Sequence, residues 1–178
     1  MSKARTFSRT FPVGHDSAGN KTLFVEKILN TLDINYSSIS YKNWLINNNP
    51  NIDEKTINDF FDNLEQTDKT KSHTVRKGQS IKKGELVSFR VWSEKPYRSK
   101  QIKFAPDIKV NIFPVKFDDL GFVYLNDSPD YLKHDKQSIL AKNDGLTNIE
   151  FMNWFFLRQK PFKGFEGQVI CWDSKIEY

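Results

Sequence analysis

The sequence predicts an α+β domain in which a small β-barrel carries flanking helices. Over residues 22–66, apolar residues recur at helical spacing and show no strand-like alternation. From residue 67 on, short alternating segments are divided by turn residues, and a helix-capping sequence follows at residue 147. A chain of 178 residues is long enough to bury one core, so we expect a single domain over residues 1–178.

The first third of the chain is expected to be helical after an irregular start. Residues 1–21 contain Pro12, Gly14 and Gly19, which interrupt regular structure. The three helices expected next cover about residues 22–33, a short segment from Ser40 to the Asn47–Pro50 cluster, and about residues 53–65.

Alternation of apolar and polar residues marks the expected strands. The clearest is Leu86–Trp92, whose odd-numbered residues Val87, Phe89 and Val91 share one face. Even-numbered apolar residues continue over 102–112, where a proline at position 106 indicates a bend or an edge. Further short strands are expected at His73–Arg76, Phe122–Leu125 and Gln168–Trp172.

Two helices are expected between the last strands. One covers about 129–142 and ends at the turn sequence Asn143–Gly145. The other begins with a capping box, in which Thr147 and Glu150 satisfy each other's backbone donors. Aromatic residues at helical spacing in all these helices are expected in the core: Trp44, Phe60, Phe61, Phe151, Trp154 and Phe155.

Several absences narrow the class of protein. No apolar run reaches the roughly 20 residues that cross a bilayer, and the first residues lack the apolar centre of a secretory signal. Cys171 is the only cysteine, so we expect no internal disulfide and interpret it as a small buried hydrophobe. We therefore expect a cytoplasmic protein without membrane contact.

Metal ions and cofactors are not expected. The residues His15, His73, His134 and Cys171 lack the spacing of metal ligands. The sequence also lacks a glycine-rich phosphate loop, a Walker pattern and a nucleophile elbow.

Positive charge is concentrated in the middle of the chain. Residues 68–103 hold eleven Lys and Arg against three Asp and Glu, a local net charge of +8. The whole chain carries +5, so the remainder carries −3. A basic segment within an otherwise slightly acidic chain indicates an anionic partner. We expect nucleic acid rather than a membrane surface, because no basic amphipathic helix accompanies the basic segment. The alternative is a solvated face with scattered lysines.

An aromatic and basic mixture follows the predicted strand 86–92. Trp92, Tyr97 and Arg98, with Lys95 and Lys100, form the combination that binds single strands by base stacking and phosphate contacts. The alternative interpretation is a basic hairpin tip on which Trp92 packs.

The stretch Lys71–Arg76, Lys-Ser-His-Thr-Val-Arg, concentrates side chains suited to binding or catalysis. Three motifs follow in order: Lys83-Gly84-Glu85, the turn Asp144–Thr147 before a helix, and the closing Gly167–Trp172. In this order they resemble the ASCH family, the activating-signal-cointegrator homology domains of the PUA-like superfamily.

This resemblance implies a PUA-like small β-barrel. It covers about residues 67–172 as the barrel portion, with the helix at 22–32 before it and residues 33–66 as an N-terminal helical insertion. Some small members of the family resemble amidohydrolases that act on acylated cytidine, and others bind or cut RNA.

The resemblance also implies roles for three residues. Lys71 would take the proton of the Thr74 hydroxyl, and Asp144 would orient the amine or relay protons. The hydrolase-like members have Glu where this chain has Asp144. Within one strand, Lys71 and Thr74 would point to opposite faces, so they converge only if the strand begins after Lys71. Arg76 suits an oxyanion, a phosphate or a base edge.

Three hypotheses follow. The leading one is an RNA-binding or modified-nucleobase-binding domain with a cleft around Lys71–Arg76. The alternatives are an amidohydrolase on acylated nucleosides or a ribonuclease using Lys71, Thr74 and Asp144, and a protein–protein module using helices 38–66. Partners would be RNA, single-stranded nucleic acid or a nucleoside, and the sequence leaves the oligomeric state open. The residues expected to contact the ligand are His73, Arg76, Lys77, Trp92, Tyr97, Arg98 and Lys100.

Overall fold

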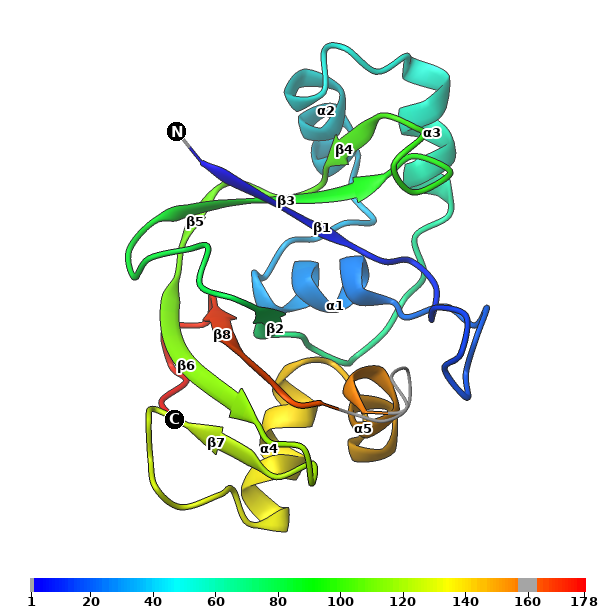
Figure 1. Ribbon diagram of the computed structural model, residues 1–178. Helices are drawn as coiled ribbons and strands as arrows, with labels where there is room; N and C mark the ends of the chain where they lie inside the picture. Colours follow the sequence, from blue (N-terminus) through cyan, green and yellow to red (C-terminus); the bar gives the residue numbers. More distant parts are fainter. Residues whose placement is uncertain (1, 157–162) are drawn as a thin grey trace.

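The computed structural model describes residues 2–156 and 163–178, and the α+β class is confirmed (Figure 1). The described part contains five helices and two four-stranded sheets. The helices are α1 (Phe24–Thr31), α2 (Ile39–Asn48), α3 (Glu54–Asp62), α4 (His134–Asn143) and α5 (Asn148–Phe155). The strands are β1 (Lys3–Phe7), β2 (His73–Lys77), β3 (Leu86–Trp92), β4 (Gln101–Lys103), β5 (Ile108–Lys109), β6 (Asn111–Phe117), β7 (Val123–Leu125) and β8 (Phe165–Cys171).

The described strands form two sheets and do not close into one barrel. The first sheet has the order β1-β3-β4, with β5 also paired to β3, and the second has the order β2-β8-β6-β7. All pairs are antiparallel except β1 with β3. Only Val110 separates β5 from β6, so one extended segment passes from the first sheet to the second. Alternation assigns residues to faces but leaves open which strand edges pair, so it could not distinguish two sheets from a barrel.

The N-terminus is the clearest error of the sequence prediction. Lys3–Phe7 is a strand and not irregular, and it runs parallel to β3 with Lys3 opposite Val87 and Phe7 opposite Val91. In this strand only Phe7 is fully buried. The pentapeptide therefore carries no apolar alternation, and its strand conformation comes from hydrogen bonding to β3.

Local capping signals agree well with the structure. Ser38 begins α2 by accepting from the Tyr41 N–H, two residues before the expected cap. The capping box of Thr147 and Glu150 is present at the start of α5, as predicted. The helix expected from about residue 129 begins only at His134, and the strand expected to end near residue 112 continues as β6 to Phe117.

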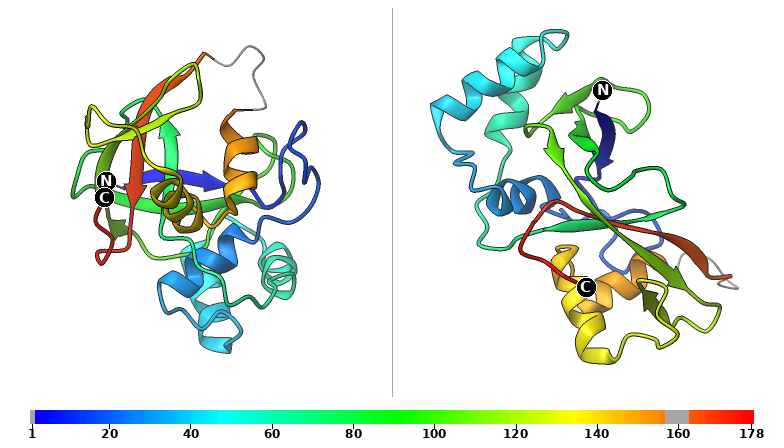
Figure 2. Two further views of the ribbon diagram at one scale, coloured as in Figure 1. Left: turned by 90° about the horizontal axis from the view of Figure 1, so that it is seen from below. Right: turned by 90° about the vertical axis from the view of Figure 1, so that its left-hand side faces the viewer.

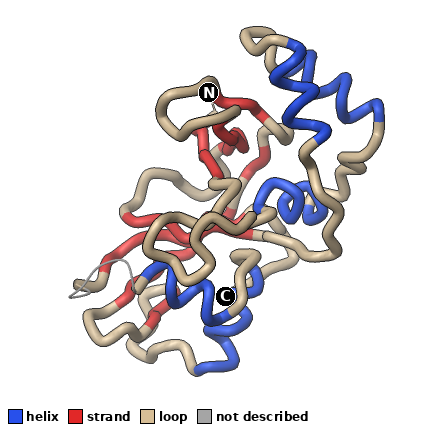
Figure 3. Tube along the Cα trace, turned by 90° about the vertical axis from the view of Figure 1, so that its right-hand side faces the viewer, coloured by secondary structure: helices blue, strands red, loops and turns tan. Residues whose placement is uncertain are grey.

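Four of the described helices lie as two pairs at opposite ends of the molecule, and α1 lies between the pairs (Figures 1, 2 and 3). At one end, α2 and α3 pack together beside the first sheet, where the Tyr41 hydroxyl donates to the Phe104 carbonyl at 2.8 Å. At the other end, α4 and α5 lie beside the second sheet (Figure 1). No helix within residues 2–156 or 163–178 is long and apolar enough to cross a membrane.

Candidate functional site

A cavity of about 340 Å³ lies where the two sheets meet α1 and α5. It gathers side chains that are far apart in the sequence, and aromatic rings form much of its wall. The lining residues are Thr6, Phe7, Ser8, Pro12, Phe24, Lys71, Thr74, Val75, Arg76, Trp92, Pro96, Tyr97, Asp144, Trp154 and Phe155. Six of the residues expected in the site therefore share one cavity: Lys71, Thr74, Arg76, Trp92, Tyr97 and Asp144.

Lys71 lies immediately before β2 because its backbone is held by other elements. Its N–H donates to the Lys27 carbonyl and to the Thr31 hydroxyl, both on α1, at 3.1 and 3.0 Å. Its carbonyl accepts from the Trp172 indole N–H at 2.9 Å. Regular pairing with β8 begins only at His73. The strand thus starts after Lys71, which is the condition for Lys71 and Thr74 to face the same space.

The Lys71 side chain forms a buried ion pair with Asp144. Its Nζ lies 2.5 Å from Asp144 Oδ1, also donates to the Asp144 carbonyl, and lies 4.2 Å from the centre of the Phe24 ring. The two residues are 1% and 4% exposed. Burial lowers the pKa of Lys71 to about 8, although Asp144 raises it. Burial likewise raises the pKa of Asp144, and the Lys71 ammonium opposes that rise.

Gly145 allows the side chains of Lys71 and Lys27 to approach the end of α4. Its φ of +74° lies in the left-handed region, and a Cβ there would stand 3.0 Å from the Cβ of Lys71 and 3.2 Å from Cδ of Lys27. Lys27 Nζ donates to the Gly145 carbonyl at 2.7 Å. Two successive carbonyls after the helix therefore each accept from a buried lysine, which suits the negative end of the helix dipole.

Thr74 and Arg76 contribute polar groups to the same cavity. No hydrogen bond of the Thr74 hydroxyl occurs within the described residues. Arg76 Nη2 donates to the Thr6 carbonyl at 2.9 Å, and its guanidinium carbon lies 5.7 Å from the centre of the Phe7 ring. Arg76 Nε is buried and has no hydrogen-bond partner in the described part of the chain. Arg76 therefore holds an unused donor beside the cavity.

The loop after β3 forms the rim. The rings of Trp92 and Tyr97 lie 5.4 Å apart, and Tyr97 is 89% exposed. Tyr97 has a φ of +62°, a conformation that costs a residue with a Cβ about 1–2 kcal/mol. An exposed aromatic side chain held in a strained conformation at a cavity mouth is a frequent property of binding sites.

The other expected contact residues lie outside the cavity lining. His73 is fully buried, and its Nε2 lies 4.0 Å from Asp144 Oδ1. Lys77 is exposed at the far end of β2, and Arg98 is exposed on the rim loop. Lys100 donates to the Asn51 carbonyl at 2.6 Å.

The basic segment does not form one continuous surface. Lys82 and Lys83 precede β3, whereas Lys95, Arg98 and Lys100 follow it. The seven residues of β3 span roughly 20 Å. Lys103 is paired with Asp107 at 2.8 Å. Among the exposed cations of this segment, Lys95 and Arg98 are next to the lining residues Pro96 and Tyr97.

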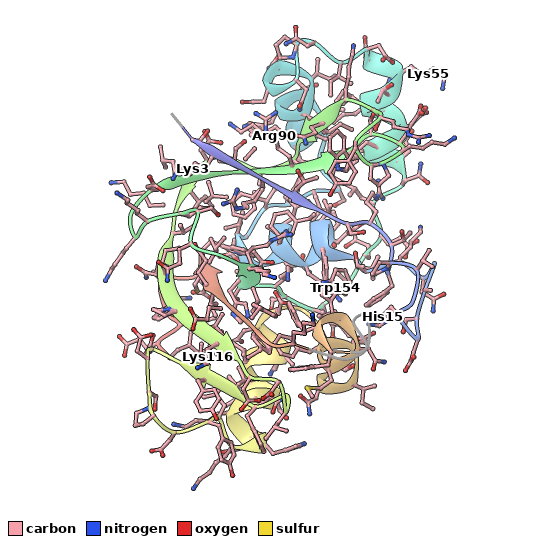
Figure 4. The ribbon with its side chains drawn as sticks, in the orientation of Figure 1. Lys3, His15, Lys55, Arg90, Lys116 and Trp154 are labelled. Carbon is pink, nitrogen blue, oxygen red and sulfur yellow. The ribbon has the colours of Figure 1, made fainter. Side chains whose placement is uncertain are left out.

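Four aromatic residues of the wall were not predicted as site residues: Phe7, Phe24, Trp154 and Phe155. Trp154 and Phe155 were expected in the core because their helical spacing is the same for a core face and for a cavity wall. Both are only partly buried. Trp154 lies beside His15 between α5 and the N-terminal segment, with ring centres 6.0 Å apart (Figure 4).

Within the described ranges, no group of three or more His, Cys, Asp or Glu side chains could hold a metal ion. Cys171 is buried, as expected, and burial raises the pKa of its thiol to about 11. Comparisons with protein-family models, with curated proteins and with solved structures found no match. The site is therefore defined by its own geometry: an aromatic cavity with a buried Lys–Asp pair, a threonine and an arginine.

Proposed function

We propose that this protein binds a nucleobase, either a modified nucleoside or a base of an RNA strand, in the cavity around Lys71–Arg76. The observation that carries the proposal is the composition of this cavity, in which aromatic rings surround a few polar groups at the base. Small-molecule sites have this character and commonly occupy about 300–1,000 Å³. A volume of about 340 Å³ fits one nucleoside and excludes a longer stretch of nucleic acid.

The polar groups match the edges of a base. Arg76 Nε–H can donate to a ring nitrogen or a carbonyl of the ligand, and the Asp144 carboxylate can accept from an exocyclic amine. Trp92 and Tyr97 stand at the mouth, where a base can stack on an aromatic face. Pairing with a base would also satisfy the buried Arg76 donor.

The finer fold assignment is part of this proposal. The passage of one extended segment from β5 into β6 supports an opened PUA-like barrel, and so does the order of the ASCH-like motifs in the chain. Residues 33–66, with α2 and α3, would then be the inserted helices. Their role as a protein-interaction surface stays a prediction.

A fluorescence titration with nucleosides and short oligonucleotides tests the proposal, because Trp92 and Trp154 line the cavity. Tyr97→Ala is expected to weaken binding at least about fivefold, since stacking on an aromatic residue contributes about 1–3 kcal/mol per base. Tyr131→Ala is the matched control, because Tyr131 is also exposed but lies outside the lining. Equal effects of both substitutions, or no binding by the wild type, would contradict the proposal.

Salt dependence distinguishes a base site from a backbone-binding surface. Lys95 and Arg98 are the exposed cations next to the lining residues Pro96 and Tyr97, so the log–log slope for a single strand should be about −1.4. A slope several times steeper would mean that the basic residues before β3 also contact the strand.

A second candidate is hydrolysis of an acylated nucleoside, and one observation favours it. Lys71, whose pKa is lowered to about 8, shares the cavity with the unpartnered Thr74 hydroxyl. In such a reaction the neutral amine takes the hydroxyl proton as Thr74 Oγ1 attacks the acyl carbon. The departing amine then takes that proton, and water releases the acyl group from Thr74.

Turnover of an acylated cytidine separates hydrolysis from binding. Thr74→Ala is expected to abolish turnover and to leave affinity nearly unchanged, whereas Thr74→Ser keeps a hydroxyl and should retain activity. Failure of the wild type to release the acyl group would remove the hydrolase candidate and would leave the binding proposal intact.

A further inference from the structure

His73 lies behind the Lys71–Asp144 pair and does not line the cavity. Its Nε2 is 4.0 Å from Asp144 Oδ1, the same oxygen that accepts from Lys71. This nitrogen is buried and has no hydrogen-bond partner among residues 2–156 and 163–178. A buried polar atom without a partner is costly, so its position beside the carboxylate requires an explanation.

Tyr178 determines which nitrogen of His73 carries the proton. The Tyr178 hydroxyl is hydrogen-bonded to His73 Nδ1, and its oxygen accepts from Asn143 Nδ2 at 3.0 Å. Among the described residues, His73 Nδ1 is the acceptor within reach of the phenolic proton, since the Asn143 amide donates to the phenol oxygen; we therefore assign Nδ1 as the unprotonated nitrogen. The neutral imidazole therefore carries its proton on Nε2, which is the nitrogen nearer to Asp144.

The surroundings of both rings keep them in these protonation states. Burial lowers the pKa of His73 well below 6.5, and Lys71 lowers it further. Burial also raises the pKa of Tyr178, so the phenol remains a donor at neutral pH. The titratable groups around the imidazole are Lys71, Asp144, Tyr178 and, opposite it on β8, Cys171.

We infer that His73 is a positioning residue for Asp144. Tyr178 holds the imidazole so that Nε2–H lies near Oδ1, the oxygen that also accepts from Lys71. The Val75 backbone N–H interacts with the same carboxylate, and its remaining lone pairs can accept from a ligand. A movement of about 1 Å brings Nε2–H within hydrogen-bond distance of Oδ1. His73 Nε2–H is thus a side-chain donor for the carboxylate that remains when Lys71 loses its proton. This inference deepens the proposed function and rests on it only for its effect on binding.

Nitrogen NMR of the histidine-labelled protein without ligand tests the tautomer directly. The chain has three histidines, so His15→Gln and His134→Gln identify the His73 signals by elimination. We expect a neutral His73 with its proton on Nε2 at pH 6.5 and above, because burial lowers the pKa of the imidazole. A proton on Nδ1, or an imidazolium at pH 6.5, would overturn the inference.

Tyr178→Phe removes the orienting hydroxyl and keeps the ring, which packs edge-on against Phe113 at 5.1 Å. We expect a mixture of tautomers and an approximately fivefold weaker affinity for a nucleoside that binds the wild type. Tyr41→Phe is the matched control, because it also removes a buried phenol that donates one hydrogen bond, to Phe104. The control should leave the tautomer and the affinity unchanged.

The two proposals fail in different ways. An unchanged tautomer and affinity in Tyr178→Phe would overturn the role of His73 even if nucleosides bind. A tautomer change in Tyr178→Phe, without nucleoside binding by the wild type, would refute the proposed function and support the positioning of Asp144.

Discussion

Replacing Lys71 by Met tests whether Lys71 and Asp144 form a coupled buried pair. The substitution keeps the apolar stem against Phe24 and removes the ammonium that lies 2.5 Å from Asp144 Oδ1. Asp144, at 4% exposure, would then be buried without the ammonium that pairs with it, and only the more distant charge of Arg76 would remain. Removing one partner of a buried ion pair costs about 3–5 kcal/mol, so we expect a loss of that size in the free energy of unfolding at pH 7.

The loss of unfolding free energy in Lys71→Met should depend on pH through the protonation of Asp144. Burial already raises the pKa of Asp144, and loss of the Lys71 ammonium raises it further. A carboxyl whose pKa is higher in the folded than in the unfolded chain contributes stability at low pH, and loses it as pH rises through the folded value. The penalty for Lys71→Met is therefore expected to be clearly smaller at pH 5 than at pH 7.

Urea unfolding at pH 5 and pH 7, followed by tryptophan fluorescence, measures both quantities. Lys27→Met is the matched control: Lys27 is also buried and donates to the Gly145 carbonyl, but no carboxylate of residues 2–156 or 163–178 lies within ion-pair distance of its amine. In the double variant Lys71→Met/Asp144→Asn, most of the stability should return and the pH dependence should vanish. The reasoning is refuted if the penalty is equal at both pH values, or if Lys27→Met shows the same pH dependence.

Two further predictions concern the same region. Gly145→Ala should lower the free energy of unfolding by at least about 1 kcal/mol more than Gly78→Ala does. Both glycines have a positive φ, but a Cβ at Gly145 would press against Lys71 and Lys27, whereas a Cβ at Gly78 would meet no atom within 4 Å. Equal losses in thermal unfolding would contradict this. Tyr97→Gly should raise stability by about 1 kcal/mol by relieving its φ of +62°, yet it should weaken nucleoside binding as much as Tyr97→Ala does.

Much of the fold was predictable because the relevant interactions are local. Strand β3 matches the alternation of Leu86–Trp92, and the capping box at Thr147 begins α5 where expected. Capping and amphipathic spacing involve residues within a turn or two of each other, so a single sequence contains the information. The pairing of strand edges is not local, which is why β1 was missed and two sheets were taken for one barrel.

For the candidate site too, the sequence determined the residue types, and the tertiary structure determined their contacts. Its chemical groups were visible in the sequence, because Lys, Thr and Arg in one short stretch, followed by a distant Asp before a helix, form a recognisable order. The contact between Lys71 and Asp144 spans 73 residues, and that between His73 and Tyr178 spans 105. Such contacts depend on how α1, α4 and the end of the chain pack around β2. Packing also buries the pair, lowers the pKa of Lys71 to about 8, and surrounds it with Phe7, Phe24 and Trp154. Burial is a property of the assembled molecule, and so are the protonation states and the cavity that depend on it.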